Sequence, residues 1–288
     1  MTFSALDDAR PLSTQLRSVD AAQLLRRVCV SAPYFALKTP SYAHGQFQAS
    51  AVADLPLGPE AGPMGSAELS RHAAIAGLCC AALAQDDDRR RFYLAQRAEY
   101  TSFQAAAPYG SRVTFTAKLR SLDKRSARAS VGAKVGETPV ALLEVDYTIL
   151  TEYAFERLFR TRHRPTPPQT EMNVQLNGAV TVERDRAWLE VAEIPEAACA
   201  GHFTDYPALP VALLVGQLGE RVANLVPSGR LRSMQVSVNA TDLCWAGEQV
   251  RFETRRAPAR NADSETFECQ VVAEGRRVCS AEFAVVAF

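Results

Sequence analysis

The longest apolar segment of the chain has the composition of a buried helix. Residues 66–84 begin with polar side chains, and from Ala73 onward they are almost entirely Ala, Leu, Ile, Gly and Cys. Alanine and leucine favour the helix, and a helix that is apolar on every side must be enclosed by other structure. The pattern therefore predicts a buried helix with Ser66 as its N-cap.

Segments typical of strands surround this helix. Strands are predicted at 35–38 and 45–53 before it and at 93–103, 111–119, 127–135 and 140–150 after it, with turn signals such as Pro108-Tyr109-Gly110 and Gly136-Glu137 between them. A short helix at 19–28 precedes these strands, and a second short helix is predicted at 151–159. A loop rich in proline and glycine, 54–65, leads into the long helix.

The same order recurs in the second half of the chain. Strand material at 180–191, a loop at 194–209, a helix at 210–225 and strands at 232–239, 249–256, 266–273 and 278–288 repeat the sequence of elements. Gly110, Val113 and Phe115 recur with the same relative spacing as Gly247, Val250 and Phe252. We therefore predict two copies of one module.

A helix enclosed by a curved antiparallel sheet is the hotdog architecture, so the predicted fold class is α+β, a double hotdog. The predicted domains are a loose N-terminal tail (1–18), a first module (19–159), a linker (160–170) and a second module (171–288). Paired modules of this kind align their sheets edge to edge, so the fused chain replaces a homodimer. A homodimer of double hotdogs is left open as a further level of assembly.

The loop before the second long helix carries the most suggestive chemistry. It reads Gly201-His202-Phe203, with Pro207 and Pro210 following, and it ends at an apolar helix. The prolines stiffen the loop, and free N–H groups at a helix start lie beside the histidine. The motif resembles the Gly-His-Phe loop of the beta-hydroxyacyl-(acyl carrier protein) dehydratases. Residues 32–35, Ala-Pro-Tyr-Phe, also resemble that family's opening segment, and the rest of the chain resembles it only as architecture.

The resemblance implies a histidine that works with an Asp or Glu from the hotdog helix of the other module. At the family's acid position the second helix has Gly216, beside Gln217, whereas the first helix carries Glu68 near its start. The predicted site therefore pairs His202 with Glu68. The symmetric second site would lack the groups that the reaction needs.

Two features leave the details of the site open. Glu68 lies two residues before the position of the family's acid, which Ser70 holds, so Ser70 and His72 are alternatives for the residue that faces His202. The residues expected to contact substrate are His72, Tyr206, Val211 and Gln217.

The resemblance predicts a dehydratase of 3-hydroxyacyl thioesters, carried by acyl carrier protein or coenzyme A, in fatty acid or polyketide-type biosynthesis. His202 would remove the C2 proton and Glu68 would protonate the departing hydroxyl, while N–H groups near Val211 polarise the carbonyl. No cofactor is implied. Two alternatives stay open: a hotdog thioesterase, and a non-catalytic acyl-binding or assembly partner.

Composition narrows the function classes further. The 32 Lys and Arg balance the 32 Asp and Glu, so no bulk charge draws the chain to nucleic acid or to an anionic membrane. The seven cysteines form no C-x-x-C pair and are expected to be reduced thiols. The first twenty residues do not resemble a signal peptide, the apolar runs are shorter than a membrane span, and no spacing indicates a metal site. The expected setting is cytoplasmic, without nucleic-acid or membrane partners.

Overall fold

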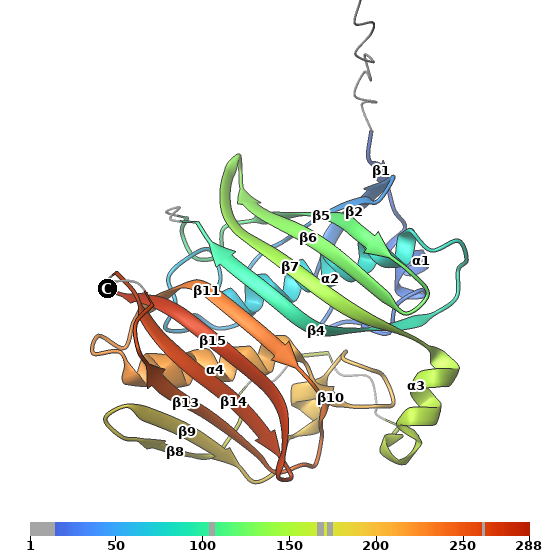
Figure 1. Cartoon of the computed structure of the whole chain (residues 1–288). Coiled ribbons are helices and arrows are strands. Elements are labelled where there is room, and N and C mark those ends of the chain that lie inside the picture. The colour runs from blue at the N-terminus through green and yellow to red at the C-terminus, as the bar shows by residue number, and fades with distance from the viewer. Residues whose placement is uncertain (1–14, 104–106, 166–169, 172–174, 261–262) are drawn as a thin grey trace, which may run out of the picture.

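A curved antiparallel sheet of thirteen strands wraps around two long helices in the computed structural model (Figure 1). The structure describes residues 15–103, 107–165, 170–171, 175–260 and 263–288. Both helices lie on the same side of the sheet, and the sheet curves around them.

The first half of the chain forms one long helix and the strands that enclose it. Its elements are β1 (Arg17–Ser18), α1 (Ala21–Leu25), β2 (Lys38–Ala43), β3 (Gln46–Ala51), α2 (Ser66–Leu83), β4 (Arg91–Ser102), β5 (Val113–Leu122), β6 (Ser126–Val135) and β7 (Thr138–Thr151). In the sheet they follow the order β1-β2-β3-β5-β6-β7-β4. The first predicted strand, 35–38, is displaced, because β2 begins only at Lys38.

The second half follows the same order of elements. After α3 (Glu152–Leu158) and the 3-10 helix η1 (Arg160–Arg162) come β8 (Ala179–Val182), β9 (Arg186–Val191), the 3-10 helix η2 (Glu196–Cys199), β10 (Ala208–Leu209), α4 (Val211–Leu225), β11 (Leu231–Ala240), β12 (Cys244–Trp245), β13 (Val250–Ala257), β14 (Glu265–Ala273) and β15 (Arg276–Ala287). The sheet continues from β4 as β11-β15-β14-β13-β9-β8, while β10 and β12 form a separate pair.

The predicted tail and linker fall partly outside the described residues. Residues 1–14 of the tail are not described, and Arg17–Ser18 pair with β2 rather than lying loose. The predicted linker starts with η1, and its residues 166–169 are not described.

Helix α2 is enclosed, as its apolar sequence predicts: fourteen of its eighteen residues are buried. Its N-cap is Gly65, so the prediction of Ser66 as the cap is wrong. Glu60 takes over the role of the cap, because its carboxylate accepts hydrogen bonds from Ser66 N at 2.5 Å and from Ser66 Oγ at 2.8 Å. A carboxylate at this end also interacts favourably with the helix dipole.

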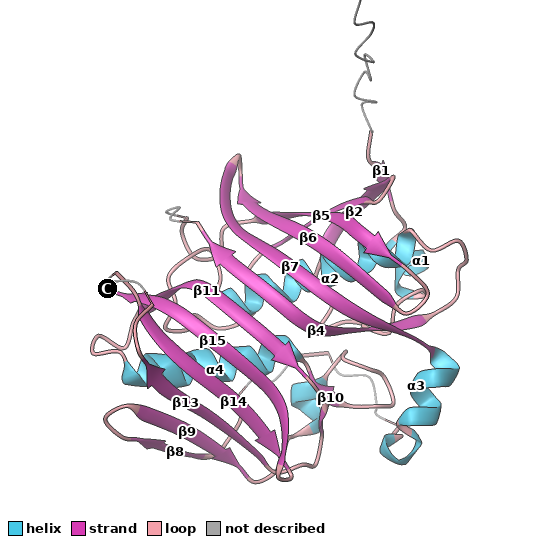
Figure 2. Cartoon of the chain, in the orientation of Figure 1, coloured by secondary structure: helices cyan, strands magenta, loops and turns pink. Residues whose placement is uncertain are grey.

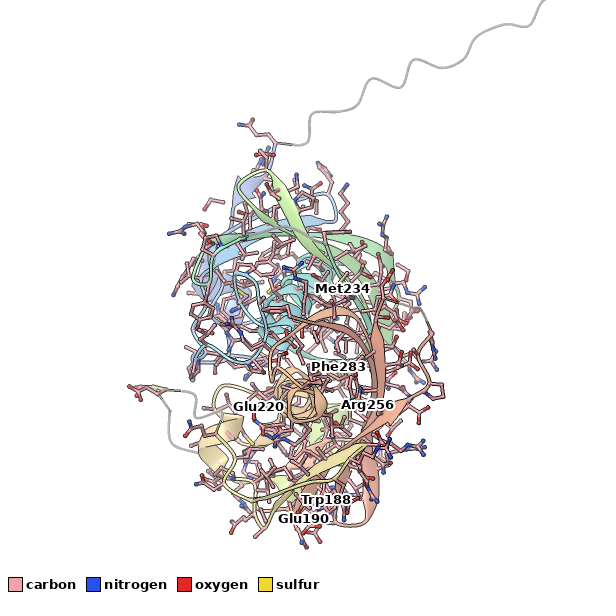
Figure 3. The ribbon with its side chains drawn as sticks, turned by 90° about the vertical axis from the view of Figure 1, so that its left-hand side faces the viewer. Trp188, Glu190, Glu220, Met234, Arg256 and Phe283 are labelled. Atoms are coloured by element: carbon pink, nitrogen blue, oxygen red, sulfur yellow. The ribbon has the colours of Figure 1, made fainter. Side chains whose placement is uncertain are left out.

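Helix α4 packs on the second half of the sheet (Figure 3). A methyl group added at Gly219 would lie 3.8 Å from Phe283 of β15, so helix and strand are close neighbours. Arg256 donates to Leu225 O at 2.6 Å and thereby satisfies a free carbonyl at the end of the helix. Glu190 of β9 is exposed. No helix among the described residues is both long and apolar enough to cross a membrane.

The two halves join where β4 pairs with β11 (Figure 2). Only five residue pairs form this junction, between Arg97–Thr101 and Gln235–Asn239. Residues 91–96 of β4 have no partner in β11. Gln96 is a β-bulge, because its neighbours Ala95 and Arg97 pair with consecutive residues of β7. The two central strands therefore separate at one end of the junction.

Candidate functional site

An apolar cavity of about 340 Å³ lies between the two long helices and the central strands of the sheet. Ser70, Ala74 and Leu78 line it from α2, each about one turn after the last, and Val211 and Val215 line it from α4. Strands β4, β7 and β11 complete the wall. A mostly apolar cavity with a few polar groups is the usual form of a small-molecule site.

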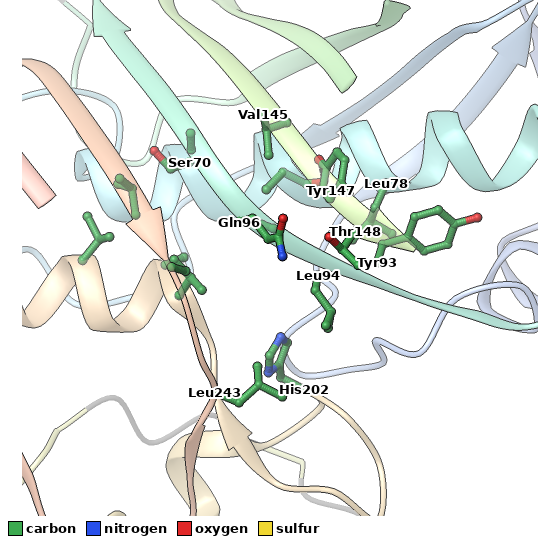
Figure 4. A pocket seen from close by; sticks show the side chains of 18 of the residues that line it. Ser70, Leu78, Tyr93, Leu94, Gln96, Val145, Tyr147, Thr148, His202 and Leu243 are labelled. Atoms are coloured by element: carbon green, nitrogen blue, oxygen red, sulfur yellow. Dashed lines mark hydrogen bonds between the residues drawn. The ribbon is translucent and has the colours of Figure 1, made fainter. Parts of the chain in front are cut away.

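The cavity meets solvent where β4 and β11 separate. Gln96, Leu158, Thr241 and Asp242 line it and are exposed. The pairing of the two strands ends at Arg97, directly beside the bulge at Gln96, and the opening lies at this point. Figure 4 shows the side chains around this region, with His202 and Leu243 close to each other in the view.

His202 reaches the cavity because its loop docks on the first half of the chain. Gly201 has a φ of +75°, and a Cβ at this position would overlap the carbonyl oxygen of Ser31, so the position requires glycine. Ser31 N donates to Gly201 O at 2.9 Å, and Val30 and His202 form an isolated β-bridge. The motif glycine is thus a docking residue between the two halves.

The imidazole of His202 is held in one orientation. Its Nδ1 lies 2.9 Å from Ala208 O, and this distance fits an Nδ1–H that donates to the carbonyl. Within the described residues, Nε2 has no hydrogen-bond partner, and the ring lines the cavity. Burial lowers the pKa of His202 to about 4, although the hydrogen bond with the backbone carbonyl of Ala208 acts in the opposite direction. The imidazole is therefore neutral near pH 7, with the lone pair of Nε2 available as a base.

Aromatic rings fix the rest of the loop. Phe203 has a φ of +48°, a backbone conformation that a bulky residue adopts only when its surroundings hold it there. Its ring lies edge-on to Phe92 and to Phe155 of α3, with centroids 5.2 and 5.3 Å apart. Tyr206 packs against Phe155 in the same way. Tyr206 does not line the cavity, so the structure gives it a supporting role rather than the predicted contact with substrate.

Glu68 does not meet His202. It is buried on a face of α2 that does not line the cavity, and its Oε1 accepts hydrogen bonds from Asp54 N at 2.7 Å and Leu55 N at 3.2 Å. The carboxylate thus holds the start of the loop 54–65. The predicted pairing of Glu68 with His202 is not formed, since the two residues before the family's position rotate Glu68 by about 200° around the helix axis.

Glu68 belongs to an ionic cluster that we call the α2 cluster: Asp54, Glu68, Arg71 and His72, of which Asp54 is exposed and the other three are buried. Arg71 is fully buried and donates to Asp54 and, at 2.9 Å, to His72 Nε2. Burial lowers the pKa of His72 to about 3, with the charge of Arg71 acting in the same direction. Burial raises the pKa of Asp54. His72 is therefore neutral, and it does not line the cavity.

The α2 cluster also contains the metal-ligand types that the sequence spacing did not reveal. One atom each of Asp54, Glu68 and His72 lies within 4.8 Å of the others. The guanidinium of Arg71 lies within hydrogen-bond reach of Asp54 and His72. The positive charge beside these side chains is therefore that of Arg71.

Of the remaining predicted residues, some line the cavity and others do not. Val211 lines the cavity from the first turn of α4, whereas Gln217 is buried in α4 away from it. Ser70 lines the cavity, but Figure 4 shows it apart from His202, with Gln96 between them in the view. Gly216 faces α2: a methyl group there would lie 3.4 Å from Ala67 Cβ.

Two further cavity residues, neither of them predicted as a site residue, bear on the geometry around His202. Gln96 enters the cavity wall because of the bulge, and Figure 4 shows its amide pointing toward the imidazole of His202. Tyr34 lines the cavity from the segment on which Gly201 docks, and its ring lies edge-on to His202 with centroids 5.1 Å apart. No signal in the sequence marks Gln96, whereas Tyr34 lies in a segment that the motif comparison had already singled out.

Comparisons with solved structures place the chain in the hotdog fold. It matches the tesB protein of Mycobacterium avium subspecies paratuberculosis with a TM-score of 0.57 and 11% identity over 86% of this chain and 95% of that one. The 12:0-ACP thioesterase of Umbellularia californica matches with a TM-score of 0.54 and 10% identity, over 83% and 93%. A hotdog-fold protein of Alicyclobacillus acidocaldarius matches with a TM-score of 0.52 and 11% identity, over 89% and 98%. Protein-family models and curated protein sequences give no match.

The comparisons correct the predicted function. Thioesterases recur among the structural matches, including proteins of Lactobacillus plantarum and Thermobifida fusca. The dehydratase prediction also depended on Glu68 as the acid opposite His202, and the structure places Glu68 in the α2 cluster. The prediction of a dehydratase is therefore wrong, and the thioesterase alternative is the better supported of the two.

Proposed function

We propose that this chain is a double hotdog that hydrolyses acyl thioesters of coenzyme A or of acyl carrier protein, at one site between modules 19–159 and 171–288. The observation that carries the proposal is the neutral imidazole of His202, whose Nε2 has no partner among the described residues and whose ring lines an apolar cavity. The thioesterase names of the structural neighbours support the choice of reaction.

His202 acts as the general base. A water molecule gives one proton to Nε2 while its oxygen forms a bond to the thioester carbon, which produces a tetrahedral intermediate. When the intermediate collapses, the carbon–sulfur bond breaks and the imidazolium returns the proton to the leaving thiolate. The products are a carboxylic acid and a thiol, and the histidine is neutral again. The apolar cavity holds the acyl chain.

Backbone N–H groups at the start of α4 stabilise the negative charge of the intermediate. The amides of Leu213 and Leu214 donate to Pro210 O, at 2.9 and 3.0 Å, whereas those of Val211 and Ala212 have no such backbone partner among the described residues. Val211 and Ala212 both line the cavity. N–H donors at a helix N-terminus stabilise an oxyanion. The donor is a backbone group, so valine can supply it as well as glycine.

Gln96 supplies a further polar group in the cavity wall. Its amide points toward His202 at the opening of the cavity (Figure 4), where it can orient the attacking water. An amide does not change its charge with pH, so its role is to position the water and not to remove a proton.

The test is an assay of the wild-type protein with acyl-CoA and acyl-(acyl carrier protein) substrates of several lengths. We expect free thiol and free carboxylic acid in equal amounts, measured with a thiol reagent and by mass spectrometry. Binding of the thioesters without turnover would contradict the proposal and favour a non-catalytic acyl-binding protein.

The pH profile of the reaction checks the state of His202. The base is active only when neutral, so kcat/KM should stay level from neutral pH down to about pH 5 and then fall about tenfold per pH unit below the pKa of about 4. An unburied histidine would lose activity already near its ordinary pKa of about 6.5. An inflection at that higher pH would show that the imidazole is not desolvated in the working enzyme.

A further inference from the structure

The hydroxyl group of Tyr34 belongs to a side chain of the cavity wall and has no hydrogen-bond partner among the described residues. The residue is 6% exposed and lines the cavity. Within the described residues its hydroxyl makes no hydrogen bond. Its ring contacts His202 and lies 5.8 Å from the guanidinium carbon of Arg71. The hydroxyl is not among the fully buried atoms that lack a partner, so it is accessible from the cavity and can donate a hydrogen bond to a polar group of a ligand.

The other hydroxyl groups that line the cavity either have a partner in the protein or are more exposed than that of Tyr34. Tyr147 donates to Ala74 O at 2.6 Å, and Ser66 donates to Glu60 at 2.8 Å. Ser70 and Thr148 are only half-buried, and Thr241 donates to Arg277 O at 3.0 Å. Tyr93 and Tyr100 have side-chain partners in Gln85 and Ser102. The phenol of Tyr34 therefore stands out among them.

The position of Tyr34 limits where the ligand's polar group can lie. The rings of Tyr34 and His202 are 5.1 Å apart, and His202 marks the place where the thioester carbon reacts. An acyl group whose thioester lies beside His202 therefore presents its first few carbon atoms to Tyr34. Burial raises the pKa of Tyr34 to about 12, against the lowering effect of Arg71, so the phenol keeps its proton and donates at neutral pH.

We infer that the site prefers acyl thioesters that carry an oxygen, as a hydroxyl or oxo group, at or near C3, and that the hydroxyl of Tyr34 donates a hydrogen bond to this oxygen. The inference rests on the proposed function, because that function places the thioester beside His202. A chain without the oxygen leaves the phenol unpaired, and a site built to bond an oxygen discriminates against the analogue that lacks it. The remaining wall is apolar and accepts the rest of the chain.

The experiment compares three coenzyme A thioesters of one chain length: 3-hydroxyacyl, unsubstituted acyl, and an acyl chain hydroxylated at its far end. In the wild-type protein we expect kcat/KM for the 3-hydroxyacyl thioester to exceed the other two by about tenfold or more. In Tyr34→Phe this preference should fall to about one. In the control Tyr147→Phe, whose lost hydroxyl already has a protein partner, the preference should persist.

Two results would overturn the inference: thiol release by the wild-type protein without a preference for the 3-hydroxyacyl thioester, or a preference that Tyr34→Phe leaves intact. Equal loss on all three thioesters in Tyr34→Phe leaves the ratio intact and therefore counts against the inference as well. If no thioester is cleaved, the proposed function fails. The ratio of dissociation constants for the same compounds, measured by calorimetry in the same variants, then decides the role of Tyr34.

Discussion

Replacing His202 by alanine is expected to lower kcat for thiol release by about two to four orders of magnitude, because the reaction loses its general base. The change leaves the cavity and the oxyanion donors in place. The measurement is the steady-state rate of thiol release from the best wild-type substrate, with the enzyme concentration raised to follow the residual rate. His202→Gln should be similarly slow, since an amide can hydrogen-bond but does not take up the proton.

A histidine far from the cavity provides the matched control. His44 is exposed in a turn with a φ of +42°, and asparagine tolerates this conformation well. His44→Asn should keep the wild-type rate within a factor of about two, as surface substitutions usually do. A His202→Ala enzyme that turns over at the wild-type rate, in a preparation with the thermal midpoint of the wild type, would remove His202 from the mechanism.

Replacing Glu68 by alanine is expected to lower the free energy of unfolding by about 3–5 kcal/mol, because the fully buried Arg71 loses part of its ionic environment. The amides of Asp54 and Leu55 also lose their acceptor. For a protein of this size the loss corresponds to a fall of the thermal midpoint on the order of 10 °C. Thermal unfolding followed by circular dichroism measures it, together with kcat of the folded enzyme.

Glu137→Ala is the control for this change. The side chain of Glu137 is fully exposed, so its removal should alter the free energy of unfolding by no more than about 0.5 kcal/mol. The role that the sequence predicts for Glu68, protonation of the departing hydroxyl, implies the opposite pattern: a loss of catalysis with stability preserved. A Glu68→Ala variant with normal stability and no turnover would restore that prediction and contradict the α2 cluster as a structural unit.

The elements of the fold could be predicted because their signals are local. The uninterrupted apolar run after Ala73 has only one arrangement that keeps it from water, a helix covered on all sides, and α2 is buried in this way. The strands between Arg91 and Leu150 could be read from turn residues. The recurrence of the same order of elements in the second half extended these local signals to the whole chain.

The site could be predicted only in part, because half of it depends on helix phase and on sheet register. His202 stands in a loop whose glycine and prolines are visible in the sequence, and it does line the cavity. Glu68 was chosen for its residue type, whereas its position on the helix turns it toward Asp54 and Leu55. Gln96 enters the cavity wall through a bulge, and no pattern of residues in the sequence predicts this bulge.

Tyr34 shows a third limit. Its environment is built from segments that are distant in sequence: Arg71 of α2 on one side and His202 of the second half on the other. A sequence shows that an aromatic residue is present. It does not show which of its atoms will be left without a partner after the chain has folded.

The bulge at Gln96 also sets how the width of the opening can change during evolution. Deleting this single residue would leave the β4 residues on its N-terminal side opposite their present partners in β7, because the bulge adds one residue to β4 without shifting the pairing. Leu94 would stay opposite Thr148, and regular pairing with β7 would continue through Ala95 and Arg97. A one-residue deletion in a central strand would thus take Gln96 out of the cavity wall in a single step and leave the other side chains of β4 on their present faces.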